Sequence, residues 1–124
     1  MEAIIEDRTL SKKDTAYLSM ATYMASLSKA RRKHGAVIVK GGSVLATGFN
    51  KDRNHPNNVS EEHIKDYCSV HAEVDAMKKA GATKGATIYV ARVNSFGNQM
   101  MSRPCSRCYK KIKQSGIKKV VYTI

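Results

Sequence analysis

The sequence predicts an α/β domain in which helices alternate with strands that form one mixed sheet. The segments predicted along the chain follow the order helix, strand, strand, helix, strand, helix, strand. The first two strands are joined by Gly41-Gly42, a turn that is typical of an antiparallel hairpin. Each later strand follows a helix, which is typical of parallel crossover connections on one sheet.

The first helix is predicted to begin after Ser11, because Asp14 stands three residues later in a capping-box arrangement. Apolar residues at helical spacing predict its buried face: Tyr17, Met20, Met24 and Leu27. The helix is expected to end near residues 29–33, where cations suit a C-terminus. Gly35 is expected to break the chain before the first strand.

The first two strands are predicted at residues 36–40 and 43–50. Residues 51–69 are polar and rich in turn formers, so they predict an irregular loop that is long for a compact domain. The remaining predicted elements are a helix at 71–80 ended by Gly81, a strand at 86–93, a loop at 94–103, a helix from Pro104 to about residue 115 and a strand at 118–124.

The length of 124 residues predicts a single domain with a modest core. No run of about 18 apolar residues is present, so no membrane association is expected. The acidic N-terminus lacks the layout of a signal peptide. Three cysteines do not indicate a secreted disulfide scaffold, and a cytoplasmic location is therefore expected.

The net charge of +12 is unevenly distributed along the chain. Residues 1–75 contain eleven Lys/Arg and ten Asp/Glu, whereas residues 76–124 contain eleven Lys/Arg and no acidic residue. This asymmetry indicates an anionic partner for the basic C-terminal half, such as single-stranded nucleic acid. A solvated surface that keeps the protein soluble explains the same charges equally well.

Two short motifs contain the residue types that predict chemistry. They are His71-Ala72-Glu73 and Pro104-Cys105-Ser106-Arg107-Cys108, which together give the H-x-E and P-C-x-x-C signature of zinc deaminases. Zinc binds imidazole nitrogen and thiolate sulfur in tetrahedral geometry. His71, Cys105 and Cys108 therefore supply three ligands, and the fourth position is left for water, as in catalytic zinc sites.

Glu73 is predicted to transfer protons at this site. It lies two residues from His71, close enough to reach a water on the metal without binding the metal itself. Zinc lowers the pKa of a bound water from about 15.7 to about 7. Glu73 therefore fits a general base that later delivers the proton to a substrate nitrogen.

On these motifs the chain resembles the cytidine and deoxycytidylate deaminase superfamily over roughly residues 15–124. Val37-Ile38-Val39 and Gly48-Phe49-Asn50 resemble the strand pair that precedes the metal helix, and residues 116–122 resemble the strand after the cysteine helix. The resemblance implies a three-layer helix–sheet–helix fold with a mixed sheet. The family commonly adds a C-terminal helix and a fifth strand after these elements, and this chain is expected to lack both.

The resemblance also implies that residues 1–124 form one catalytic domain for zinc-dependent hydrolytic deamination of cytosine or adenine. Residues 116–122 most resemble deoxycytidylate-type members, so a cytosine nucleotide such as dCMP is the expected substrate, with the uracil nucleotide and ammonia as products. The alternative enzyme is a polynucleotide deaminase acting on single-stranded DNA or tRNA. The alternative of another class is a non-catalytic zinc module that binds nucleic acid.

Three residues are predicted to bind substrate. The family position of Asn50 implies a hydrogen bond to the substrate sugar, and that of Ala72 implies a backbone contact with the carbonyl edge of the base. Arg103 lies beside the metal cysteines and is a candidate for a phosphate contact. Because relatives form dimers or tetramers, a homo-oligomer is expected.

Other interpretations of the cysteines and histidines remain open. A redox C-x-x-C would leave His71-Ala72-Glu73 unexplained. Cys68, His55 or His63 as a fourth ligand would close the zinc site and make it structural. Some nucleotide deaminases of the family carry a second metal in the corresponding loop, and Cys68 with His55 or His63 is a candidate remnant of that site. The commonest role of a lone cysteine is a small buried apolar residue.

Overall fold

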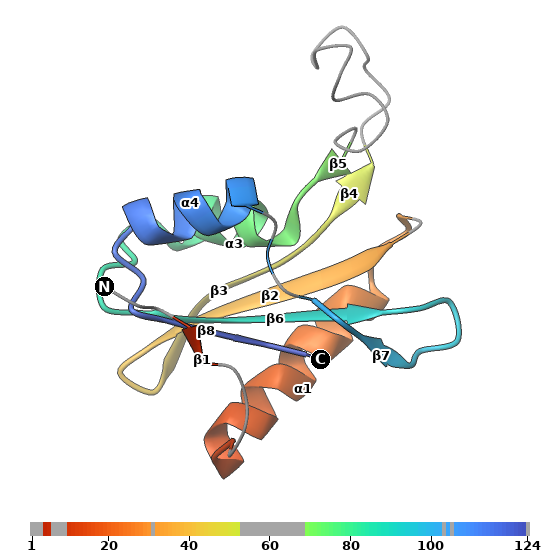
Figure 1. The fold of residues 1–124 in the computed structure, drawn as a ribbon, viewed down its shortest axis with the longest axis horizontal. Helices are drawn as coiled ribbons and strands as arrows, with labels where there is room; N and C mark the ends of the chain where they lie inside the picture. The colour runs from red at the N-terminus through yellow and green to blue at the C-terminus, as the bar shows by residue number, and fades with distance from the viewer. Residues whose placement is uncertain are drawn as a thin grey trace, which may run out of the picture.

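The computed structural model describes residues 4–5, 10–30, 32–52, 69–102, 104 and 106–123. Figure 1 shows a twisted sheet with α1 (Lys12–Ser26) on one face and α3 (Ala72–Ala80) and α4 (Ser106–Gln114) together on the other. This arrangement confirms the expected helix–sheet–helix sandwich. No helix within the described ranges is both long enough and apolar enough to cross a membrane.

The main sheet has the strand order β1-β8-β6-β2-β3. β2 (Lys33–Lys40) pairs antiparallel with β3 (Ser43–Phe49) and with β6 (Thr87–Val93). β6 pairs in parallel with β8 (Lys119–Tyr122), so the sheet is mixed as predicted. Gly41 and Gly42 form the β2–β3 turn, and both have the positive φ that a two-residue hairpin turn favours.

Four short strands were not predicted from the sequence. β1 (Ile4–Ile5) pairs in parallel with β8, so the sheet has a fifth strand, supplied by the residues before α1 and not by the C-terminal elements that the sequence was expected to lack. β7 (Gln99–Met100) pairs with β6 inside the predicted loop 94–103. β4 (Lys51–Asp52) and β5 (Ser69–Val70) pair with each other at the two ends of the predicted loop 51–69. Each has two residues, too few to show any periodicity.

The signals at the ends of the helices are largely confirmed. The capping box is present, because the Asp14 N–H donates to Ser11 Oγ at 3.0 Å and the Ser11 N–H donates to Asp14 Oδ2 at 3.2 Å. Gly81 follows α3 with a φ of 74°, as expected for a glycine that ends a helix. α1 ends at Ser26, earlier than predicted, because the chain is already extended in β2 from Lys33.

The buried face of α1 differs from the prediction. Its buried residues are Asp14, Leu18, Ala21 and Ala25. Met20 and Leu27, predicted to be buried, are 39% and 42% exposed. Gly35 does not break the chain but lies within β2, where a Cβ would come 2.2 Å from the carbonyl oxygen of Ala21. Tyr17 and Met24 are partly buried and pack against this core, as predicted. At Gly35 the helix backbone lies so close to the strand that the small side chains of Ala21 and Ala25 are the ones that fit there.

Side chains alternate between the two faces of the sheet and divide the core into two layers. Even-numbered residues of β2 and β6 pack with α3 and α4; they are Ala36, Ile38, Ile88 and Val90, in contact with Ala72, Ala76 and Ile112. Odd-numbered residues pack with α1; they are Val37, Val39, Tyr89 and Ala91, in contact with Leu18 and Ala21. The parity of a position on β2 or β6 therefore identifies the layer that it faces.

Candidate metal centre

Three residues from the two predicted motifs meet where α3 begins beside α4. His71 is the N-cap residue of α3, Glu73 lies in the first turn of the same helix, and Cys108 lies in α4. One ligand atom from each residue lies within 4.8 Å of the other two. His71 Nδ1 and Cys108 Sγ are 3.0 Å apart. The fold thus brings the H-x-E motif and Cys108, the second cysteine of the P-C-x-x-C motif, together, as the sequence predicted.

His71 has the protonation state that metal binding requires. Burial lowers the pKa of its imidazole, and the positive charges of Arg107 and Lys111 lower that pKa further. The ring is therefore neutral near pH 7, which is the form that coordinates a metal. Neutral imidazole and the thiolate of Cys108 are donors that zinc prefers, so the cluster fits a zinc ion.

Glu73 is the acidic member of the cluster. Its side chain is 4% exposed, and burial raises the pKa of its carboxyl group above the ordinary value. A carboxyl group whose pKa is closer to 7 exchanges protons more effectively at neutral pH. The environment of Glu73 therefore suits the proton transfer that the sequence predicts for it.

Gly48 of β3 sets how closely the first turn of α3 approaches the sheet. A Cβ at this position would lie 2.8 Å from the carbonyl oxygen of Ala72 and 2.7 Å from the nitrogen of Ala76. Ala72 is completely buried in the first turn, where backbone N–H groups have no acceptor within the helix. Its contact with the substrate base remains a prediction, and the position of its N–H in the first turn, where the helix itself supplies no acceptor, is consistent with it.

Asn50 is buried beside the end of β3, and its side chain holds neighbouring backbone. Its Oδ1 accepts a hydrogen bond from the N–H of His34 at 2.8 Å, and its Nδ2 donates to the carbonyl oxygen of Arg32 at 2.5 Å. A carboxamide has one further N–H and one further lone pair. The structure thus gives Asn50 a role in joining two chain segments, and its contact with the substrate sugar remains a prediction.

Several predicted site residues lie outside the described part of the chain. They are Cys105, Arg103, Cys68, His55 and His63. The third zinc ligand, the phosphate contact and the second metal site therefore remain predictions. Pro104 is buried, and α4 begins at Ser106, directly after Cys105 in the sequence.

Two residues that the sequence analysis did not select face the layer that contains the metal cluster. His34 of β2 and Arg92 of β6 are direct cross-strand partners, and both have even numbers. Burial, followed by the charges of Arg92, of His71 when it is protonated, and of Arg32, lowers the pKa of His34 from 6.5 to about 4. Arg92 therefore acts electrostatically on His34. Strand parity is the signal that finds this pair, once the pairing of β2 with β6 is known.

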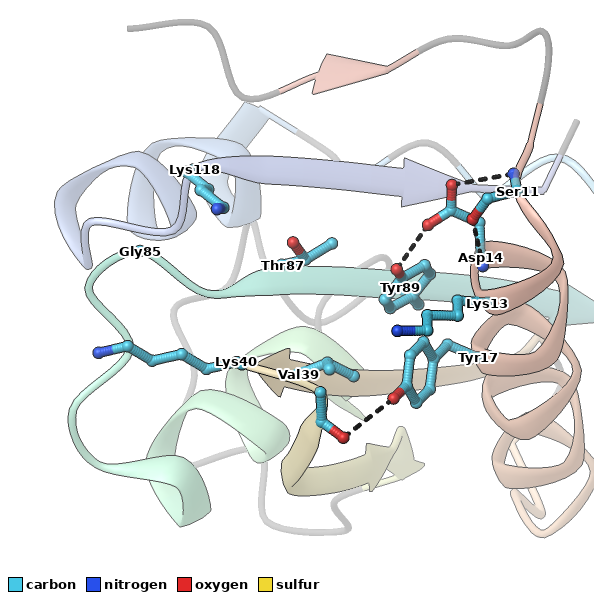
Figure 2. A pocket seen from close by; sticks show the side chains of 12 residues that line it. Ser11, Lys13, Asp14, Tyr17, Val39, Lys40, Gly85, Thr87, Tyr89 and Lys118 are labelled. Carbon is cyan, nitrogen blue, oxygen red and sulfur yellow. Dashed lines mark hydrogen bonds between the residues drawn. The ribbon is translucent and has the colours of Figure 1, made fainter.

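A separate cavity of about 220 Å³ lies on the opposite face of the sheet, beside the start of α1 (Figure 2). Tyr17 donates a hydrogen bond to the carbonyl oxygen of Gly42 at 3.3 Å, and Tyr89 donates to Asp14 at 2.7 Å. Three lysines also line the cavity: Lys13, Lys40 and Lys118. Because Tyr89 faces α1, this cavity is not part of the metal cluster.

Residues 11–124 match the family described as the cytidine and deoxycytidylate deaminase zinc-binding region. The chain belongs to this deaminase family. Deoxycytidylate deaminases of Schizosaccharomyces pombe and Saccharomyces cerevisiae are 31% and 30% identical over 88% and 89% of this chain, but over 36% and 37% of their own lengths. The chain thus spans about a third of these relatives. The deoxycytidylate deaminase of Mycobacterium phage D29 is 34% identical over 88% of this chain and 92% of its own.

Solved structures of the family support the same assignment. The dCMP deaminase of cyanophage S-TIM5 in its apo form has a TM-score of 0.66 and 30% identity, over 92% of this chain and 84% of that one. Its complex with dCMP and dUMP has a TM-score of 0.66 and 28% identity, over 93% and 83% of the two chains. This protein is therefore a member of a hydrolase family and carries a His/Glu/Cys candidate zinc site.

Proposed function

We propose that this chain is a zinc-dependent hydrolytic deaminase that converts a cytosine nucleotide, with dCMP as first choice, to the uracil nucleotide and ammonia. The cluster of His71, Glu73 and Cys108 carries the proposal, because it combines zinc donors with a buried proton carrier. Similarity to proteins named deoxycytidylate deaminase and to a structure holding dCMP and dUMP supports the substrate class. Residues 1–124 act as one catalytic domain.

The proposed metal ligands are His71, Cys105 and Cys108. A bound zinc ion supplies Lewis acidity that makes water nucleophilic at neutral pH. The low pKa of His71 favours this ligand set, because the imidazole does not have to lose a proton before it binds the metal. The buried thiol of Cys108, 2% exposed, is shielded from competing reactions in bulk solvent.

Glu73 moves the protons of the reaction. Its carboxylate takes a proton from the attacking water and gives it to the ring nitrogen next to C4. The C–O bond forms at C4 as the C4–N3 double bond opens. The C–N bond to the exocyclic amine then breaks, and the amine takes the remaining proton of the added hydroxyl through Glu73 and leaves as ammonia. The backbone N–H of Ala72 holds the carbonyl edge of the base, and Arg103 contacts phosphate.

Ammonia release from zinc-loaded protein tests the proposal. The substrates are dCMP, deoxycytidine, dCTP and a short single-stranded oligonucleotide with an internal cytosine, and the Glu73→Gln protein is the matched inactive control. We expect dCMP to be deaminated fastest and the control to release no ammonia above background. No deamination of any cytosine compound by protein with one zinc per chain would overturn the proposal.

The exposed surface of α4 favours a second candidate, a polynucleotide deaminase. The helix carries four exposed cations and no acidic residue: Arg107, Lys110, Lys111 and Lys113. The ammonium group of Lys113 lies 5.8 Å from the centre of the Tyr109 ring, so one aromatic side chain accompanies these cations. Deamination of the oligonucleotide with dCMP left unchanged, and binding that falls steeply with salt, would establish this candidate in place of the first. Salt-dependent binding without deamination would indicate the non-catalytic module.

A further inference from the structure

Arg92 projects into the layer of the molecule that holds the metal cluster. Val90, two residues earlier on β6, packs with Ala72, Ala76 and Ile112 of the α3–α4 layer. Residues two apart on a strand face the same side, so Arg92 faces this layer as well. Its cross-strand partner is His34, whose pKa is lowered by the charge of Arg92 and by that of His71 when it is protonated. Arg92 is thus a cation near the candidate active site and is outside both sequence motifs.

The guanidinium group of Arg92 has an unsatisfied buried donor. Its Nε is buried and has no hydrogen-bond acceptor within the described part of the chain. The ion pairs between described residues involve Asp14 and Asp75, not Arg92, and residues 76–124 contain no acidic residue. A buried charged donor without an acceptor destabilises a fold, and native proteins rarely keep one unless it has a function.

After Arg92 the chain turns back, and β7 pairs antiparallel with the end of β6. Met100 of β7 pairs with Arg92 on the side opposite to His34. The Ser102 hydroxyl then donates to the carbonyl oxygen of Val90 at 2.8 Å and anchors the segment that leads to the cysteine motif. Arg92 is therefore held between two neighbouring strands, which limits the motion of its backbone.

The cationic side chains in the layer of the metal cluster favour the binding of an anionic ligand. Arg107 and Lys111 are exposed on α4, the helix that carries Cys108, and Arg92 faces the same layer from β6, so cations from two elements lie on the layer that holds the cluster. A guanidinium group binds phosphate through two parallel hydrogen bonds, and one of these donors is commonly Nε. A nucleotide provides such a phosphate, whether as the monoester of dCMP or as a diester in a strand.

We propose that Arg92 is a substrate-binding residue that contacts a phosphate group of the nucleotide. This assignment rests on the proposed function, because it takes the nucleotide as the ligand of the cluster. It adds a specificity determinant that the sequence motifs do not contain. Arg92 distinguishes a nucleotide from the corresponding nucleoside, since the nucleoside lacks the group that the guanidinium binds.

The kinetic test compares Arg92→Met with Lys78→Met, each of which removes one positive charge. Lys78 is exposed near the end of α3, away from the first turn. We expect Arg92→Met to lower kcat/KM for dCMP by about 10- to 100-fold, with deoxycytidine changed by less than about twofold. Lys78→Met should leave both values within about twofold. An equal loss for dCMP and deoxycytidine in Arg92→Met would overturn the proposal.

A binding test separates this proposal from the proposed function. Titration of dUMP and of deoxyuridine into zinc-loaded Glu73→Gln protein, with and without Arg92→Met, does not depend on turnover. We expect Arg92→Met to weaken dUMP binding by about 10- to 100-fold and to leave deoxyuridine unchanged. This binding result, together with no deamination by the zinc-loaded protein that retains Glu73, would reject the proposed function and keep the Arg92 assignment. Unchanged affinity for both dUMP and a short single-stranded oligonucleotide after Arg92→Met would reject the assignment.

Two further measurements complete the test. The short oligonucleotide, titrated in the same way, identifies the phosphate: loss of dUMP binding alone indicates the monoester, and loss of oligonucleotide binding alone indicates the diester.

The melting temperature of Arg92→Met should equal or exceed that of the starting protein, because a buried donor without an acceptor has been removed. A marked fall in melting temperature together with unchanged dUMP affinity would show a structural role instead.

Discussion

Replacing Gly48 by alanine tests how the sheet positions the metal cluster. The added methyl group would lie 2.7 Å from the nitrogen of Ala76 and 2.8 Å from the carbonyl oxygen of Ala72. Ordinary contacts of a carbon atom begin at about 3.4–3.5 Å, so α3 must move away from β3 by roughly 0.7 Å. Both obstructing atoms belong to helix backbone, so a change of side-chain rotamer does not relieve the contact.

The expected cost of Gly48→Ala follows from this displacement. Overpacking of this kind destabilises a protein by about 1–3 kcal/mol. For a chain of this size, that corresponds to a fall in melting temperature of roughly 3–12 °C. Metal ligands tolerate shifts of only about 0.2 Å, and the displaced helix carries His71 and Glu73. We therefore expect at least a roughly tenfold loss of zinc affinity, comparable to removal of a group that orients a ligand.

Gly35→Ala is the matched control, because Gly35 packs against the other helix layer. Its Cβ would lie 2.2 Å from the carbonyl oxygen of Ala21 and 2.3 Å from the nitrogen of Ala25, so α1 must move instead of α3. We expect a larger fall in melting temperature but unchanged zinc affinity, measured by competition with a chromogenic chelator well below both transitions. Zinc affinity and dCMP turnover in Gly48→Ala equal to those of the unmodified protein would refute this reasoning.

The remaining predictions concern single side chains. Glu73→Gln should keep one zinc per chain and lower kcat by about 10²–10⁴-fold, and loss of the metal instead would disprove its assignment as a proton carrier. Cys108→Ser should lose zinc and unfold at lower temperature, which metal analysis and calorimetry measure. Cys68→Ser should keep zinc and activity, whereas loss of all zinc would indicate a closed structural site. Burial raises the pKa of Asp14, but hydrogen bonds from Tyr89 and Ser11 outweigh this effect and lower its pKa below the ordinary 3.8. The stabilisation by Asp14 is therefore present above pH 4 and is lost as the pH falls through its lowered pKa. Asp14→Asn should thus unfold more easily by about 1–3 kcal/mol at pH 7, and equal deficits at pH 7 and pH 2.5 in denaturant titrations would contradict this.

Local patterns in the sequence were sufficient for much of the fold and of the site. The order of helices and strands, the capping box at Ser11 and the Gly41-Gly42 turn depend on neighbouring residues, so they are visible without a structure. The same holds for the H-x-E and P-C-x-x-C motifs, whose imidazole and thiolate donors fit one metal. The sequence therefore determined the family, the class of chemistry and the candidate roles of His71, Glu73 and Cys108.

The tertiary structure decided the features that depend on contacts between distant segments. Hydrophobicity favoured Met20 on the buried face of α1, but Met20 is 39% exposed, and Ala21 and Ala25 occupy the point where the helix approaches Gly35 most closely. This proximity is not encoded locally. β1 exists because β8 offers it an edge, which a run of two residues does not reveal. Arg92 and His34 face the metal layer because β2 and β6 pair in one register, and a shift of one residue would turn both side chains to the α1 layer.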